Sequence, residues 1–243
     1  MKKAILLITL LVSIQINAQS KSEINKMKSF VNKVLQSTTN LLNDNTLEKT
    51  KQNQLKFISF DKNTAIIISV TTPSNDNYFA DAPATLSLFI FKKQKNGKWE
   101  IEKQYIKFDT LNGNIDNIEI QPINKGKKFL IFIENNLSKM MTQSKYLNIY
   151  YYDSENVKKI SDEIELNYTE GQTDSLFSTS SKYFIIENGM SNNVWDDKFI
   201  NNAMPIILIF SESQSYDEKK KKKVSYDTHI YSYKKDKYIE YKK

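Results

Sequence analysis

The feature that most constrains the fold is a long series of strand-like segments, which begins near Leu55 and continues to the end of the chain. Its clearest part, residues 117–166, contains four of them in a row: NIEIQ, KKFLIFIEN, YLNIYYYD and VKKISDEIEL. Short segments rich in β-branched and aromatic residues, separated by turn-forming residues, are typical of antiparallel sheets. The sequence therefore predicts a mainly β protein.

The strand pattern recurs along the chain. Three approximate units of four strands cover residues 55–108, 115–166 and 175–243. Such periods are typical of propeller blades, but a propeller has about four to eight blades. A large sandwich or barrel built from the same meander is therefore as compatible with the pattern. We expect a single β domain over residues 55–243, an antiparallel meander of about three four-stranded units, propeller-like or a large sandwich or barrel.

The character of the individual strands predicts their positions in a sheet. Runs that are apolar for most of their length are typical of central strands buried on both faces, whereas strands with polar residues throughout are typical of an edge or a solvated face. The first class contains AIIISV, FLIFI, FIIE and PIILIF, and the second contains WEIEKQYIKF and VSYDTHIYSY. Asn96 and Gly97 predict a tight hairpin before the first of the polar strands.

The region before the strands, residues 19–54, predicts a helix and a polar linker. Apolar residues from Ile24 to Leu35 follow helical spacing, with Ser22 as a plausible N-cap. Polar residues 37–40 suggest that the helix ends or bends there, and residues 43–54 predict a linker. We expect this helix to cover one face or end of a sheet, or to dock a partner.

The N-terminus has the three parts of a secretory signal peptide. Two lysines precede an apolar run from Ala4 to Ile14, and a small residue, Ala18, predicts cleavage after position 18. The run is shorter than the roughly 20 residues that span a bilayer. No cysteine follows it that could carry a lipid anchor. The sequence therefore predicts a secreted or periplasmic bacterial protein without stable membrane insertion after cleavage.

Composition excludes several kinds of chemistry. The chain has no cysteine, which excludes disulfides, thiol nucleophiles and cysteine-ligated metal centres. It also has no arginine, the side chain that grips phosphate and guanine bidentately, so nucleic-acid binding is not expected. No motif predicts a cofactor or a metal site.

The long connections between strands are the predicted ligand-binding surface. If the repeat holds, the connections at residues 71–85, 135–145 and 187–203 fall at one end of the fold, and binding residues concentrate on such loops. Tryptophan beside acidic side chains is a plausible carbohydrate platform. The predicted ligand-binding residues are Trp195, Asp196, Asp197, Tyr78 and Asp81.

His229 is the only histidine, and strand alternation places it on the same face as Asp227. This pair is a candidate acid–base pair, but a surface histidine on a polar strand is the simpler explanation. No GxSxG elbow is present to supply a serine nucleophile. The sequence leaves enzymatic activity undecided and names no catalytic residue beyond this pair.

A lysine cluster lies before the last long strand. Adjacent lysines attract anionic surfaces such as lipid headgroups, and they are also common in solvated turns. The cluster consists of Lys219, Lys220, Lys221, Lys222 and Lys223.

These observations favour an exported, non-enzymatic, β-rich binding protein of the bacterial cell envelope, with a glycan or a protein as its ligand. Two alternatives remain: a cell-envelope polysaccharide hydrolase, and a structural or assembly protein that docks a partner through its N-terminal helix.

Overall fold

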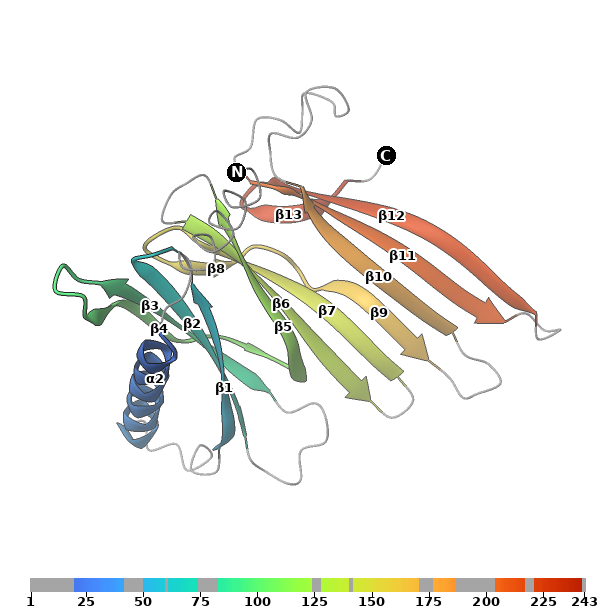
Figure 1. Ribbon diagram of the computed structural model, residues 1–243. Helices are drawn as coiled ribbons and strands as arrows, with labels where there is room; N and C mark the ends of the chain where they lie inside the picture. Colours follow the sequence, from blue (N-terminus) through green and yellow to red (C-terminus); the bar gives the residue numbers. More distant parts are fainter. Residues whose placement is uncertain are drawn as a thin grey trace, which may run out of the picture. The chain divides into compact units, whose positions relative to one another are not determined.

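The computed structural model describes residues 20–41, 50–59, 61–73, 83–123, 128–139, 142–170, 177–186, 204–216 and 221–241. This part of the chain contains one helix and two antiparallel sheets (Figure 1). The chain divides into two compact units, one with the helix and strands β1–β4 and the other with strands β5–β13. The predicted mainly β class with one N-terminal helix is confirmed.

Helix α2 spans Lys21–Leu41. Its N-cap is Ser20 and not the predicted Ser22, because Ser20 and Glu23 form a reciprocal capping box. The helix ends at Leu41, one residue after the polar residues 37–40, where the sequence predicts an end or a bend. The Ser37 hydroxyl donates to the Val34 carbonyl at 2.8 Å, which lets a polar side chain stay within the helix.

The first unit contains a four-stranded sheet in the order β1-β2-β3-β4. Its strands are those of the first predicted repeat: β1 Thr50–Ser59, β2 Thr64–Pro73, β3 Ala84–Lys93 and β4 Trp99–Leu111. Strand β1 starts within the region predicted to be a linker. The β3–β4 hairpin turns at Asn96 and Gly97 as predicted, although only Gly97 has a positive φ, of 81°.

Helix α2 covers one face of this sheet (Figure 1). Met27 and Val31 of the helix are buried against Ile67, Phe89 and Phe91 of the central strands. The 3.6-residue spacing of the helix and the two-residue alternation of the strands bring these apolar side chains to a common surface.

The second unit contains a nine-stranded sheet in the order β13-β12-β11-β10-β9-β7-β6-β5, with β8 paired to β7. Its strands are β5 Asn114–Ile123, β6 Lys128–Lys139, β7 Thr142–Tyr152, β8 Val157–Lys159, β9 Ile164–Glu170, β10 Phe177–Ile186, β11 Ile206–Tyr216, β12 Lys222–Lys234 and β13 Lys237–Glu240. The strands predicted for the second and third repeats thus share one sheet.

This sheet curls around its own core. The rings of Phe132 on β6 and Tyr183 on β10 are 6.1 Å apart, although three strand spacings of about 4.8 Å would separate these strands by about 14 Å in a flat sheet. At one end the Tyr238 N–H donates to the Ile160 carbonyl at 2.6 Å, beside a single bridge from Ser161 to Tyr238. Pairing is not continuous there, so the fold is neither a propeller nor a closed barrel.

Two predicted connections differ in the structure. The sequence predicts two strands, SLFSTS at residues 175–180 and KYFIIEN at residues 182–188, but β10 runs unbroken through Ser181 and pairs with β11 along nine positions. The predicted loop at residues 135–145 is the end of the β6–β7 hairpin, paired from Phe129 with Tyr152 to Lys139 with Thr142. Both segments are rich in polar residues, which resemble turns in the sequence.

The predicted internal and edge positions of the strands are confirmed, but the predicted burial on both faces is wrong for β10, where Phe184 is 52% exposed. The four apolar runs lie in β2, β6, β10 and β11, which are all internal strands, and β4 is an edge. Strand β12 is exposed over its first seven residues. In the described part of the chain, no helix is long and apolar enough to cross a membrane.

Candidate functional site

A groove of about 640 Å³ runs between helix α2 and the start of β4 in the first unit. One wall comes from the first three turns of the helix, and the other from five consecutive residues, Gly97 to Ile101, at the end of the β3–β4 turn and the start of β4. The lining residues are Glu23, Lys26, Met27, Phe30, Phe91, Gly97, Lys98, Trp99, Glu100 and Ile101. The buried side chains of Met27 and Phe91 form its floor.

The position of Trp99 is set by Glu23. The Glu23 carboxylate accepts a hydrogen bond from the Trp99 indole N–H at 3.3 Å and contacts the Lys93 ammonium at 3.4 Å. Its other oxygen accepts the Ser20 backbone N–H at 3.1 Å. The hydrogen bond to Ser20, together with the charge of Lys93, lowers the pKa of the Glu23 carboxyl. One carboxylate therefore caps the helix and ties it to the hairpin.

The ring of Trp99 is only partly available to a ligand. The Lys93 ammonium lies over it, 5.5 Å from the ring centroid, in a cation–π arrangement. A sugar ring could not stack on the face that Lys93 covers. The geometry therefore disfavours a glycan platform at Trp99 and leaves its edge as part of an apolar wall.

The opposite wall exposes a phenylalanine. Phe30 on α2 is 49% exposed, whereas Met27 and Phe91 below it are 3% exposed. A large apolar side chain at the rim of an apolar recess can contact both water and a ligand. Trp99 and Ile101 are half-buried on the other side. This arrangement suits an apolar side chain or segment of a partner.

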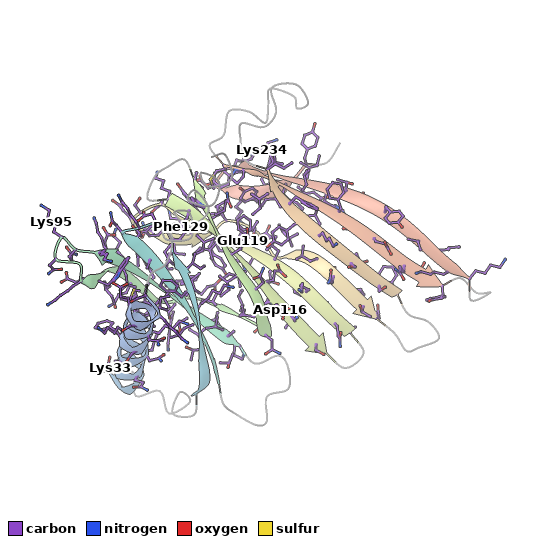
Figure 2. All side chains as sticks on the ribbon, in the orientation of Figure 1. Lys33, Lys95, Asp116, Glu119, Phe129 and Lys234 are labelled. Atoms are coloured by element: carbon purple, nitrogen blue, oxygen red, sulfur yellow. The ribbon has the colours of Figure 1, made fainter. Side chains whose placement is uncertain are left out.

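A second cluster, in the other unit, is centred on Glu134. Its carboxylate accepts hydrogen bonds from the Asn117 amide at 3.2 Å, the Tyr183 hydroxyl at 3.3 Å and the Lys145 ammonium at 3.0 Å. Lys145 also contacts Asp116 at 3.0 Å. Asp116, labelled in Figure 2, lies on β5, so the cluster joins β5, β6, β7 and β10.

The charges of this cluster are satisfied within it. Burial alone would lower the pKa of Lys145, but its hydrogen bonds to Asp116 and Glu134 outweigh that effect and raise it. Burial and the neighbouring carboxylates Glu134 and Glu119 raise the pKa of Tyr183. A lysine and a tyrosine that both hold their protons are suited to cross-linking strands and not to proton transfer.

Beside this cluster lies a polar recess of about 370 Å³. Most of its lining residues carry an amide, hydroxyl or ammonium group. Its lining consists of Asn136, Leu137, Ser138, Gln143, Ser144, Lys145, Asn167 and Thr169. Such a surface can hydrogen-bond a hydroxyl-rich ligand, but it presents no aromatic platform of the kind expected for a sugar ring.

The predicted pair of Asp227 and His229 is brought together, but Asp227 is not the nearest carboxylate. His229 Nδ1 lies 2.7 Å from Glu240 Oε1 on β13, whereas Nε2 lies 3.7 Å from Asp227 Oδ2. Glu240 is therefore the principal partner of the imidazole, and the role of the pair remains a prediction. Among the described residues, no group of three or more His, Cys, Asp or Glu side chains could hold a metal ion.

The other predicted residues lie mostly outside the described ranges. These are Trp195, Asp196, Asp197, Tyr78, Asp81, Lys219 and Lys220. Lys221, Lys222 and Lys223 are exposed at the start of β12. The structure therefore tests neither the predicted ligand-binding residues of the loops nor the predicted contact of the lysine cluster with an anionic surface.

The sequence did not single out the groove residues. Phe30 and Trp99 are 69 positions apart, and their approach depends on how the helix crosses the sheet. One signal was readable: Ser20 and Glu23 have the spacing of a capping box, which marks the start of the helix and a carboxylate at its first turn.

Comparison with protein-family models finds no match, and searches of curated proteins and of solved structures find none either.

Proposed function

We propose that this chain is an exported, non-enzymatic binding protein of the bacterial cell envelope, and that its ligand is an apolar segment of a partner protein. The observation that carries the proposal is the groove between α2 and β4, with exposed Phe30 on one wall and half-buried Trp99 on the other. Export rests on the signal-peptide pattern of residues 1–18.

Two features of the groove favour a protein ligand over a glycan. Lys93 covers the Trp99 ring, and Glu23 already accepts the indole N–H. In addition, β4 is the edge strand of its sheet in the described part of the chain, and the groove follows it from Trp99 to Ile101. A helix beside an edge strand is a common seat for an extended peptide, which adds main-chain hydrogen bonds to the edge.

The groove is also held in a fixed shape. Its helical wall is tied to the hairpin through Glu23, and its floor is buried core. A preorganised site loses less conformational entropy on binding than a site that must form around its ligand. These contacts support binding without a large rearrangement.

Peptide selection tests the proposal. Phage-displayed peptides selected on the mature chain should share apolar residues at alternate positions, as an added strand requires. Phe30→Ser should abolish binding of a selected peptide and leave the melting temperature nearly unchanged, because this side chain is half-exposed. The matched control is Phe184→Ser, since Phe184 is 52% exposed on a strand of the other unit. Equal loss in both variants, or selection of no common pattern, would contradict the proposal.

Export has its own test. The chain expressed with residues 1–18 in a bacterial host should be recovered from the periplasm or medium, with Gln19 as its N-terminal residue by peptide sequencing. Retention of an intact N-terminus in the cytoplasm would contradict export and leave the groove proposal standing.

A further inference from the structure

The first half of β12 has an exposed outer edge. On its inner side β12 pairs with β11 from Lys222 to Tyr231, but on its outer side β13 pairs only with Tyr231–Lys234. Among the described residues, no strand pairs with the outer edge of residues 222–229. Residues 222–228 are all exposed, and Tyr226 is 77% exposed. A strand edge of this kind is a template for pairing with another chain.

One hydrogen bond establishes which backbone groups face outward. The Tyr241 N–H donates to the Ile230 carbonyl at 2.7 Å, so the Ile230 carbonyl points to the outer side of β12. Backbone groups alternate sides along an antiparallel strand, and the β11–β12 register has no bulge. Val224, Tyr226 and Thr228 therefore direct their N–H and C=O groups outward, and Ser225 directs its own toward β11.

The outward edge is complementary to itself. We propose that it pairs, antiparallel, with the same edge of a second copy of this chain, about a two-fold axis at Ser225. In this register Val224 lies opposite Tyr226 of the partner subunit, and both residues use their outward backbone groups. Lys223 lies opposite Asp227 of the partner subunit on the other face of the sheet. The axis repeats each contact, so the dimer has two such charge pairs.

The charge pairs select this register. Lysines on an edge strand usually prevent pairing, because like charges would meet. Here each Lys223 meets an Asp227 whose side chain is 74% exposed; its Oδ1 accepts the N–H of Thr228 in its own chain at 2.7 Å. Sliding the strands by two residues would place Lys223 opposite Ser225 or His229 and lose both pairs. A slip of one residue would turn the side chains of one strand to the opposite face of the sheet. The interface is isologous and closed, as in most homodimers.

Charge reversal tests the proposal most sharply. The mature chain should show a concentration-dependent doubling of its sedimenting mass, weakened by salt. Lys223→Asp alone and Asp227→Lys alone should each remain monomeric, because each places like charges opposite one another. An equimolar mixture of these two variants should form a heterodimer, and the double variant should dimerise again. A wild-type chain that stays monomeric, or a dimer that survives either single reversal, would overturn the proposal.

Cysteine cross-linking reports on the axis itself. The chain has no native cysteine, so a single introduced one gives an unambiguous product. Ser225 would face itself at a non-hydrogen-bonded position, where Cα atoms are about 4.5 Å apart, within the range of a disulfide. Ser225→Cys should therefore form a covalent dimer under mild oxidation much faster than Thr228→Cys, which would face Lys222. Equal rates for the two variants would place the axis elsewhere and overturn the register.

Discussion

Strand β11 has two different environments along its length. Its first four residues, Ile206 to Ile209, are buried, whereas the residues from Phe210 to Tyr216 are exposed or half-buried. At the buried end, Ile207 and Ile209 belong to the curled core of the sheet. At the open end, Ser211 pairs its hydroxyl with that of Ser181 at 2.9 Å. The register with β12 continues unbroken across both ends.

The difference between the two ends shows that main-chain pairing and the burial of side chains contribute separately to the stability of this sheet. The main-chain ladder extends past the hydrophobic core, and the side chains of the open end add part-buried hydroxyl pairs and one edge-to-face contact between Phe210 and Phe184. Burial of an apolar side chain contributes about 1.5–3 kcal/mol, whereas a typical hydrogen bond contributes about 1 kcal/mol net. Stability should therefore be concentrated at the packed end, which leaves the open end available for association.

The largest expected effect comes from the packed end. Ile209 is 1% exposed and Phe210, its neighbour on the other face, is 47% exposed. Ile209→Ala should lower the free energy of unfolding by about 2–5 kcal/mol, through lost burial and the cavity left behind. Phe210→Ala, although it removes a larger side chain, should cost about 1 kcal/mol or less. Denaturant midpoints with unchanged slopes measure both.

The result can also contradict the comparison. If Phe210→Ala cost as much as Ile209→Ala, the open end would carry a core of its own. The division of β11 into a packed and an open part would then be wrong.

The next effect is the response to alkaline pH. Tyr238 is 4% exposed in the core, donates its hydroxyl to the Pro205 carbonyl at 2.8 Å, and has its pKa raised by burial. An unfolded tyrosine ionises near pH 10. Above that pH the unfolded chain releases a proton that the native chain retains, so stability should fall by about 1.4 kcal/mol per pH unit for this group.

Guanidinium unfolding at a series of pH values above neutral measures this slope. Tyr238→Phe keeps the ring and removes the ionisable group, so it should reduce the slope above pH 10. Tyr183, whose pKa is also raised by burial, should contribute in the same direction. An unchanged slope in Tyr238→Phe would show that this hydroxyl ionises freely in the native state.

A smaller effect is expected from the Glu134 cluster, which borders the packed end. Glu134→Gln keeps the shape of the side chain but removes the charge that Lys145 shares with Asp116. Because Asp116 remains as a partner, we expect a loss of about 1–2 kcal/mol in the free energy of unfolding. The matched control at the open end is Glu212→Gln, whose partner is Gln214 at 2.6 Å. That surface change should stay within about 0.5 kcal/mol.

Much of the local structure could be predicted from the sequence. The strands of the first sheet, the turn at Gly97 and the internal positions of β2, β6, β10 and β11 follow from short-range pattern, because alternation and turn residues act over a few positions. The continuity of β10 could not be recognised. Ser180 and Ser181 resemble a turn in the sequence, but they lie on the open half of a sheet, where polar residues are tolerated.

The contacts that define the sites are long-range. Tyr183 reaches Glu134 only because the sheet curls, and Glu240 reaches His229 only because β13 folds back beside β12. The alternation of side chains along the strand predicts that Asp227 and His229 lie on one face, and the distance of 3.7 Å between Asp227 Oδ2 and His229 Nε2 agrees with this prediction. The sequence could not identify Glu240 as the nearer carboxylate, because the position of Glu240 depends on the register of the four-residue strand β13 beside β12.

The smallest expected effect belongs to the hydroxyl pairs of the open end. Ser181 and Ser211 are half-buried, and each can replace its partner with water, so Ser211→Ala should cost only about 0.5 kcal/mol. A double-mutant cycle with Ser181→Ala should give a coupling energy of about 0.5 kcal/mol or less. Amide exchange at residues 211–216 should be faster than at Ile207 and Ile209, because the open end can separate without exposing the core. A coupling energy well above this, with equal protection along β11, would mean that the hydroxyl ladder holds the open end as firmly as the apolar core holds the packed end.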